Sequence, residues 1–173
     1  MRLGVDEAGV TELMGVTEHA RALATTAAAL LLDSPGGEGA LVAPVPPGAG
    51  EPEAQTLLGE IAAWAEAELG EARVPVVWRI LAHNVHYLRA TWRKDTALMG
   101  PGALAPRDKR RVALGVSMAT GGRYMIAYHA AALRHTGDTD RDVLEVLGVV
   151  DHYTTLNTLS EAMQIESDIR PAH

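Results

Sequence analysis

One histidine, His129, lies in an alanine-rich segment that opens at a pair of glycines and reads ATGGRYMIAYHAAALRHTG over residues 119–137. Imidazole titrates near neutral pH, so such a residue could exchange a proton with a substrate within hydrogen-bond reach. Tyr124 and Tyr128 flank His129, and Met125 lies one helical turn before it. These side chains would form a pocket for a small apolar or aromatic ligand. The structural alternative is a core histidine that bonds a backbone carbonyl or a tyrosine.

The chain contains no cysteine, which excludes disulfides, thiolate zinc sites and thiol catalysis together. Two other histidines, His83 and His86, have the i, i+3 spacing that can chelate a divalent ion, and His19 and His152 each follow an acidic residue. No further ligand can be placed beside either set. We therefore expect neither a metal site nor a cofactor.

The net charge and the length of the apolar runs argue against nucleic acid and membranes as binding partners. The 173 residues carry a formal net charge of -7, and the most basic run, residues 107–111, is interrupted by Asp108. Nucleic-acid binding depends on basic residues that neutralise phosphates, so we expect no such partner. The N-terminus lacks a secretory signal pattern, and the apolar run at residues 22–32 is far short of the ~20 residues that span a bilayer. We expect a cytoplasmic, soluble protein without a membrane partner.

The elements around these residues are predicted to be helices. Alanine and leucine, the best helix formers, dominate the apolar residues, and no run alternates with period two for long enough to indicate a strand. The predicted helices span residues 6–14, 16–33, 54–69, 75–83, 84–98, 106–120, 123–136, 141–147 and 149–165. Asn84 is a predicted N-cap, as is Asp138 or Asp140 for the final pair. Half of residues 34–53 are glycine or proline, which predicts a mobile linker or surface loop.

The two ends of the chain repeat each other. Residues 10–25 (VTELMGVTEHARALAT) match residues 143–158 (VLEVLGVVDHYTTLNT) at seven of sixteen positions, with a glycine and a histidine in register. This predicts a partial internal duplication. The predicted organisation is a helical segment at 1–33 that echoes 143–160, a linker or loop at 34–53, and a helical domain at 54–173.

Beyond residue 74 the sequence resembles the carboxymuconolactone decarboxylase and alkylhydroperoxidase D-like superfamily. The family phrases appear as RILAHN at residues 79–84, GALAPR at 102–107 and GVS at 115–117, and the similarity covers about residues 57–165. The resemblance implies an all-α alkylhydroperoxidase D-like helical bundle. It also implies assembly as a homo-oligomer, from dimer to hexamer, through helix faces. Trp64, Trp78 and Trp92 would serve as core or subunit-interface anchors.

The residues depart from the peroxidase branch at its redox site. Gly122 and Met125 occupy the two cysteine positions, and Arg110 replaces the glutamate of the proton relay, so only His129 survives. Peroxide reduction in this branch needs a thiolate, which neither a hydrogen atom nor a thioether can replace. The resemblance therefore implies the fold but not the peroxidase activity.

Two functions stay open. The first is a non-peroxidase protein that binds a small ligand or acts as a scaffold. The second is a cysteine-free acid/base enzyme, of decarboxylase or lactone type, in which His129 acts on a small carboxylate held by Arg110. The catalytic candidate is His129, and the candidate ligand-binding residues are Arg110, Gly122, Tyr124, Met125, Tyr128 and His152. The ligand is expected to be a small carboxylate or aromatic molecule.

Overall fold

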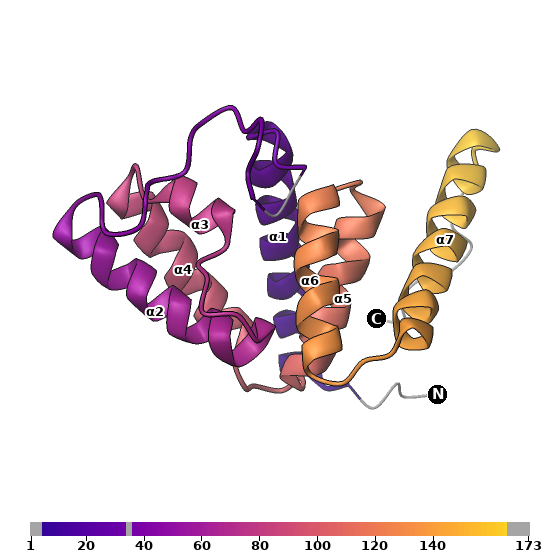
Figure 1. The fold of residues 1–173 in the computed structure, drawn as a ribbon. Coiled ribbons are helices and arrows are strands. Elements are labelled where there is room, and N and C mark those ends of the chain that lie inside the picture. The colour runs from indigo at the N-terminus through magenta and orange to yellow at the C-terminus, as the bar shows by residue number, and fades with distance from the viewer. Residues whose placement is uncertain (1–4, 34–35, 166–173) are drawn as a thin grey trace.

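The computed structural model describes residues 5–33 and 36–165, and all of its regular elements there are helices. In chain order they are α1 (Glu7–Ala29), α2 (Pro52–Leu69), α3 (Val76–Leu81), α4 (Val85–Met99), α5 (Pro106–Ala119), α6 (Arg123–His135) and α7 (Asp140–Ala162). Figure 1 shows α2, α3 and α4 on one side, α1, α5 and α6 in the centre, and α7 at the opposite edge. The predicted all-α fold is confirmed.

Several helix ends follow the local sequence signals. The Asn84 side chain accepts a hydrogen bond from the backbone nitrogen of Tyr87 at 3.0 Å, which caps α4 as expected. Gly70 ends α2 in the left-handed conformation, with φ of 73°, which costs glycine little. Pro106 occupies the first position of α5, where its missing N–H leaves no hydrogen bond unmade.

Two glycines that were predicted to break helices lie inside them instead. α1 and α7 each run for 23 residues, through Gly15 and Gly148 respectively. A Cβ on Gly15 would lie 2.8 Å from Cδ2 of Leu98, so glycine there allows α1 to approach α4 closely. An internal glycine costs only about 1 kcal/mol, which helix packing readily offsets. The cap of α7 is Thr139, which forms a capping box with Asp142, so neither predicted aspartate is the cap.

The core lies between α1, α2, α3, α4 and α6. The Trp92 ring packs edge-on against the rings of Trp78 and Trp64, with centroid separations of 5.4 and 5.7 Å. Leu23 of α1 and Val45 of the loop belong to the same buried cluster. The N-terminal helix and the loop therefore pack with the rest of the bundle.

The glycine- and proline-rich loop is attached to the bundle by its backbone. The Leu41 nitrogen donates to the Leu30 carbonyl at 2.9 Å, and the Val45 nitrogen donates to the Arg79 carbonyl at 3.1 Å. The Arg79 side chain donates back to the Val45 carbonyl at 2.9 Å. These bonds attach residues 36–51 to the bundle as a surface loop, which is one of the two forms that the composition predicts.

Buried charges hold α5 at the centre. The fully buried Lys109 ammonium donates to Glu12 of α1 and to the Gly100 carbonyl. At the other side, the buried Asp138 carboxylate accepts from Arg111 at 2.9 Å. Both ion pairs tie α5 to segments distant in sequence. Among the described residues, no helix has the length and apolar character needed to cross a membrane.

Candidate functional site

Helix α6 carries most of the candidate site. Its buried face repeats with helical spacing and consists of Tyr124, Met125, Tyr128, His129, Ala130, Ala132 and Leu133. The helix starts at Gly122, and the buried face turns toward α1, α2 and α5, with which α6 packs. Helix α6 therefore carries Tyr124, Met125, Tyr128 and His129 on one buried face, as their helical spacing predicts.

His129 is sealed inside the bundle. Its exposed fraction is 3%, and neither ring nitrogen has a hydrogen-bond partner. Its ring packs edge-on against Tyr128, with the centroids 5.1 Å apart. Burial lowers the pKa of His129 well below its ordinary value, and the charges of Arg110 and His19 lower it further. The imidazole is therefore neutral at physiological pH.

Arg110 reaches the same region from α5. It is buried, its Nη2 lies 3.5 Å from Oε2 of Glu68, and its guanidinium lies over the Trp64 ring at 5.4 Å from the centroid. Its Nη1 is buried without a partner. Arg110 is close enough to His129 to lower the pKa of the imidazole, so the fold brings together the two residues that the sequence paired.

Tyr128 lies close to Arg110 of α5, Trp78 of α3 and Asp95 of α4. Its ring stacks on Trp64 at a centroid separation of 6.0 Å, and its hydroxyl is buried without a hydrogen-bond partner. Burial raises the pKa of Tyr128 far above its ordinary value, and the Asp95 carboxylate raises it further, whereas Arg110 opposes the change. The Trp78 indole is near enough to affect this pKa as well. Its Nε1 nevertheless has no hydrogen-bond partner.

Six buried side-chain nitrogen and oxygen atoms of the described residues lack a hydrogen-bond partner, and all belong to five neighbouring residues. We call these residues the polar cluster: Trp78 of α3, Asp95 of α4, Arg110 of α5, and Tyr128 and His129 of α6. Buried polar groups in folded proteins nearly always have a partner, whether protein or water. These six atoms have no protein partner, so water or another bound group must satisfy their hydrogen bonds.

The sequence did not predict the pair formed by His19 and Asp95. Nε2 of His19 on α1 lies 3.0 Å from Oδ1 of Asp95 on α4, and both side chains are almost completely buried. Seventy-six positions separate them, so only the packing of α1 on α4 brings them together. Asp95 is the acidic member of the polar cluster. Its second carboxylate oxygen, Oδ2, has no hydrogen-bond partner.

The two positions that align with the family's cysteines are tightly packed. Met125 is fully buried in the core. Gly122 lies against α1, where an added Cβ would come within 2.9 Å of the Ala24 Cβ. Its φ of −74° is accessible to any residue, so the requirement for glycine is steric rather than conformational. The N-terminal helix fills the space that a side chain at the first cysteine position would need.

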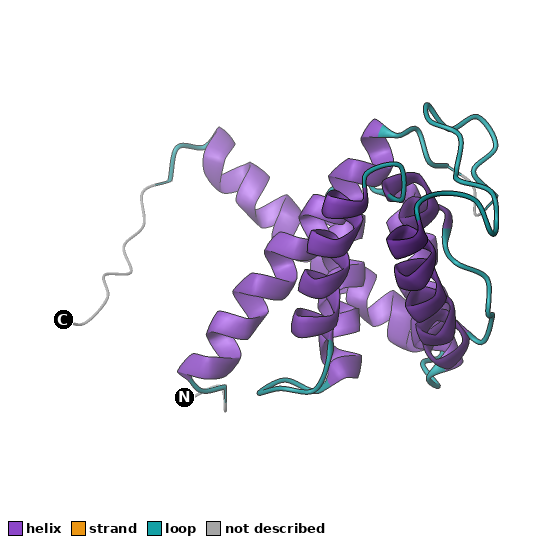
Figure 2. Cartoon of the chain, turned by 90° about the vertical axis from the view of Figure 1, so that its left-hand side faces the viewer, coloured by secondary structure: helices purple, strands orange, loops and turns teal. Residues whose placement is uncertain are grey.

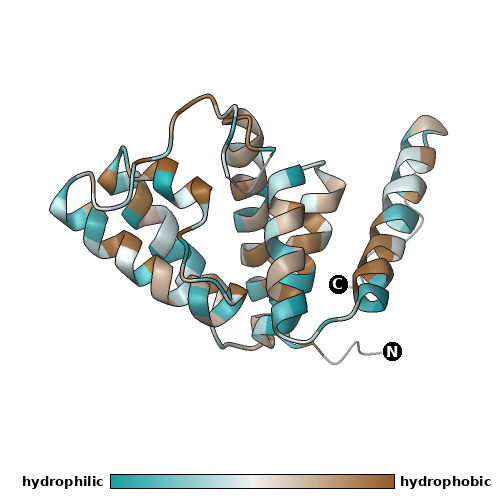
Figure 3. Cartoon of the chain, viewed as in Figure 1, coloured by the Kyte–Doolittle hydropathy of each residue, from teal (hydrophilic) through white to brown (hydrophobic). Residues whose placement is uncertain are grey.

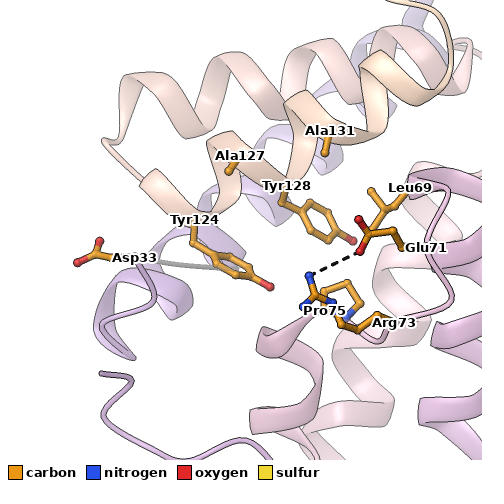
Figure 4. A pocket seen from close by; sticks show the side chains of 9 residues that line it. All are labelled: Asp33, Leu69, Glu71, Arg73, Pro75, Tyr124, Ala127, Tyr128 and Ala131. Carbon is orange, nitrogen blue, oxygen red and sulfur yellow. Dashed lines mark ion pairs between the residues drawn. The ribbon is translucent and has the colours of Figure 1, made fainter. Parts of the chain in front are cut away.

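A pocket of about 250 Å³ shares Tyr128 with the polar cluster, and Figure 4 shows the side chains that line this pocket. It lies between α6 and the segment after α2, and its lining residues are Asp33, Leu69, Glu71, Arg73, Pro75, Tyr124, Ala127, Tyr128 and Ala131. The side chains of Arg73 and Glu71 form an exposed ion pair at 3.6 Å. Tyr128 belongs to both the pocket and the polar cluster. Arg110, Met125 and His129 do not line the pocket.

The remaining histidines lie elsewhere. His152 is exposed on α7, where its ring contacts only the ring of the neighbouring Tyr153 among the aromatic pairs described. Helix α7 packs chiefly on α5, so the structure does not bring His152 to the pocket. His83 bonds the Ala43 carbonyl at 2.9 Å, which gives it a structural role in fixing the loop. In the described part of the chain, no three metal-ligating side chains gather.

The fold and this arrangement of α5 and α6 define an alkylhydroperoxidase D-like helical protein. The family model for the carboxymuconolactone decarboxylase family matches residues 86–165. The crystal structure of the alkylhydroperoxidase AhpD core from Rhodospirillum rubrum is similar at 31% identity and a TM-score of 0.63, covering 75% of this chain and 95% of that one. No curated protein matches the sequence. The chain belongs to the carboxymuconolactone decarboxylase family, without the cysteines of the peroxidase branch.

Proposed function

We propose that this chain is a non-peroxidase member of its family that binds a small aromatic or apolar carboxylate beside Tyr128. One observation carries the proposal: the six unpartnered buried atoms all belong to the polar cluster, which adjoins a pocket. Unpaired buried groups are costly, at about 1–3 kcal/mol each. A bound ligand, together with water, would form hydrogen bonds with these atoms and so remove that cost.

The chemistry of the cluster favours a ligand that accepts hydrogen bonds. Trp78 Nε1 and Arg110 Nη1 can only donate, and the Tyr128 hydroxyl is free to donate. Asp95 pairs with His19 through Oδ1 only, so its Oδ2 is the one carboxylate oxygen of the cluster that remains an unpaired acceptor. A carboxylate offers acceptor oxygens without donors, and a guanidinium is its strongest partner among side chains. This donor set supports an acidic ligand over a basic one.

The pocket suits the rest of such a ligand. Leu69, Pro75 and Tyr124 offer apolar and aromatic surface, and Tyr128 provides the connection to the polar cluster. We propose that the Tyr128 side chain rotates when the ligand binds, so that the apolar body rests in the pocket and the carboxylate reaches the donors of the polar cluster. The protein would act in the cytoplasm, as its composition predicts.

Acid/base catalysis by His129 on a small carboxylate is the second candidate. It has one observation in its favour, which is that both ring nitrogens are free of protein partners. Burial and Arg110 lower the pKa of this imidazole, however, which makes it a weaker base than an ordinary histidine. His129 is also 3% exposed and does not line the pocket. Binding without turnover is therefore the function we prefer.

Thermal unfolding with aromatic acids tests the proposal. A ligand that binds only the native state stabilises it by about 2.7 kcal/mol at a hundred times its dissociation constant. We expect benzoate or phenylacetate to raise the midpoint of unfolding, and the uncharged benzamide to raise it less. Equal effects of benzoate and benzamide, or no effect of any acid, would overturn the proposal.

A peroxidase assay with and without a thiol donor tests the other half of the proposal. We expect no turnover of hydrogen peroxide or an organic hydroperoxide, because the chain has no thiol to form the thiolate nucleophile. Clear turnover above the reagent background would show that the loss of the cysteines does not end the activity.

A further inference from the structure

A groove lies between α1 and α4, and it shares no lining residue with the pocket beside Tyr128. It has a volume of about 210 Å³, and all the residues that line it belong to these two helices, drawn in purple in Figure 2. The buried His19 and Leu23 form its floor, and the exposed Tyr87 and Lys94 form its rim. Helices hold side chains in place more accurately than loops do, so the groove presents His19 in a defined position.

The buried Asp95 carboxylate fixes the orientation of the His19 ring. Nε2 of His19 lies 3.0 Å from Oδ1 of Asp95, and the two side chains are 3% and 4% exposed. A carboxylate beside one ring nitrogen keeps the proton on that nitrogen, so Nε2 donates and Nδ1 is left as an acceptor. Nδ1 forms no hydrogen bond with the described residues, yet it is not among their fully buried unpaired atoms. It is therefore the ring nitrogen that is accessible from the groove.

This arrangement distinguishes His19 from His129, the other buried histidine of the described residues. Neither ring nitrogen of His129 has a partner that would fix its orientation, and both nitrogens are shielded from solvent. His19 has one nitrogen held by a carboxylate and the other at the floor of an open groove. An imidazole that is oriented by a carboxylate and free at its second nitrogen has the geometry of a general base.

The walls of the groove combine hydroxyl groups with small apolar side chains, in keeping with the mixed hydropathy of α1 and α4 in Figure 3. Thr26, Tyr87 and Thr91 supply the hydroxyls, and the Thr26 and Tyr87 oxygens lie 3.5 Å apart. A hydroxyl can donate to a carbonyl oxygen that gains negative charge during a reaction. The Lys94 ammonium is already paired with Glu18, so the groove favours an uncharged molecule over an ionic one.

We propose that His19 and Asp95 form a catalytic dyad that hydrolyses small uncharged esters bound in this groove. His19 is the catalytic base, and Asp95 is its positioning residue. Nδ1 of His19 takes a proton from water while the water oxygen bonds to the ester carbonyl carbon. The bond from that carbon to the alcohol oxygen then breaks, and the departing alkoxide takes the proton from Nδ1. The products are a carboxylic acid and an alcohol, so the reaction consumes only water.

The rate of this reaction should depend on the protonation of His19, because only a neutral imidazole can accept the proton. The rate should therefore rise with pH to a plateau. The neighbouring charged or titratable groups are Glu18 of α1, Asp95 and Lys94 of α4, and His129 of α6, with Arg110 of α5 next to His129. This activity does not depend on the ligand proposed beside Tyr128.

Steady-state hydrolysis of p-nitrophenyl acetate by the full chain tests the dyad. We expect saturable hydrolysis, and His19→Gln should lower kcat/KM by about a hundredfold or more, the usual contribution of a general base. His86→Gln is the matched control, because His86 is exposed on α4 and does not line the groove. Asp95→Asn should lower kcat more than it raises KM. It should also move the pH midpoint of the rate downward, because the imidazolium loses its counter-charge, whereas a merely structural Asp95 would leave the midpoint unchanged.

A second pair of variants tests the groove without altering the dyad. Ala22→Leu places a larger side chain in the groove and should lower kcat/KM. Ala28→Leu is its control, because Ala28 is exposed on the same helix but does not line the groove. Both positions are exposed and leucine favours helices, so both variants should fold, which far-UV circular dichroism checks.

Several results would overturn the inference. The first is a native chain without saturable ester hydrolysis. The second is an activity that His19→Gln leaves unchanged, or that His86→Gln reduces equally. Equal activity of Ala22→Leu and Ala28→Leu would show that the reaction takes place outside the groove. An acetylated protein that accumulates during turnover, detected by mass spectrometry, would show that a side chain rather than water attacks the ester.

Discussion

Ala24 of α1 lies against Gly122 at the start of α6, where a Cβ on the glycine would approach the Ala24 Cβ to 2.9 Å. Gly122 stands at the position of the first family cysteine. The loss of the thiol is therefore linked to the packing of the N-terminal helix, and restoring the thiol would require α1 to move.

Substitution of Gly122 by cysteine should destabilise the protein. Overpacking of a filled site typically costs about 1–3 kcal/mol, and we expect that loss in the free energy of unfolding measured by denaturant titration. Gly59→Cys is the matched control, since a Cβ on this helical glycine meets nothing within 4 Å. If the Gly122 variant were as stable as the Gly59 variant, the close contact with Ala24 would not constrain this position.

The buried pair of His19 and Asp95 should contribute far more than its exposed neighbours. Removal of Asp95, as in Asp95→Leu, leaves the buried His19 ring without its hydrogen-bond partner and is expected to cost about 1–3 kcal/mol. The double variant with His19→Leu should recover part of that loss. Glu18 and Lys94 form an adjacent pair between the same helices, 62% and 43% exposed, and Lys94→Ala should cost no more than about 1 kcal/mol. Comparable losses for Asp95→Leu and Lys94→Ala would contradict this account.

The lowered pKa of His129 predicts acid sensitivity. The unfolded chain binds a proton at His129 near pH 6.5, whereas burial keeps the native imidazole neutral. The unfolded state then binds more protons below that pH, so stability falls as pH drops through about 6.5 and continues to fall until the lowered native pKa is reached. Above pH 6.5 the residue adds no pH dependence.

Denaturant titrations at several pH values check this prediction. His129→Gln should reduce the slope of stability against pH below 6.5, while the same change at the exposed His86 of α4 serves as the control. An unchanged slope in the His129 variant would show that the imidazole is accessible to protons in the folded protein.

The Tyr128 hydroxyl has no hydrogen-bond partner, so its removal is not expected to lower the free energy of unfolding. Tyr128→Phe removes a buried group that has no partner, so the free energy of unfolding should stay the same or increase slightly. The Tyr124 hydroxyl accepts a bond from the Val77 nitrogen at 3.4 Å, so Tyr124→Phe should lower stability by about 1 kcal/mol or less. A larger loss for Tyr128→Phe than for Tyr124→Phe would mean that the Tyr128 hydroxyl is already satisfied.

Local signals made the helices predictable. The Asn84 side chain caps the start of α4, and Gly70 ends α2 in the left-handed conformation. Gly15 and Gly148 misled the prediction, because an isolated glycine can mark either a helix end or a close helix contact. Only the position of Leu98 across the interface decides between these readings at Gly15.

The site was predictable where it lies on one helix and not where it joins several. Tyr128 and His129 share α6, and the family resemblance supplied Arg110. The pairing of His19 with Asp95 depends on the packing of α1 against α4, which no local pattern records. The assignment of His152 to the site came from the sequence alone, and the structure instead places it on the exposed α7.

Calorimetric titration of the native chain with benzoate tests the central claim most directly. The account predicts saturable binding of one benzoate per chain, with an affinity about tenfold lower in Tyr128→Phe, the loss expected for one hydrogen bond of about 1.4 kcal/mol. Benzamide, which lacks the negative charge, should bind more weakly than benzoate. Absence of saturable benzoate binding, or binding that Tyr128→Phe leaves unchanged, would contradict the account.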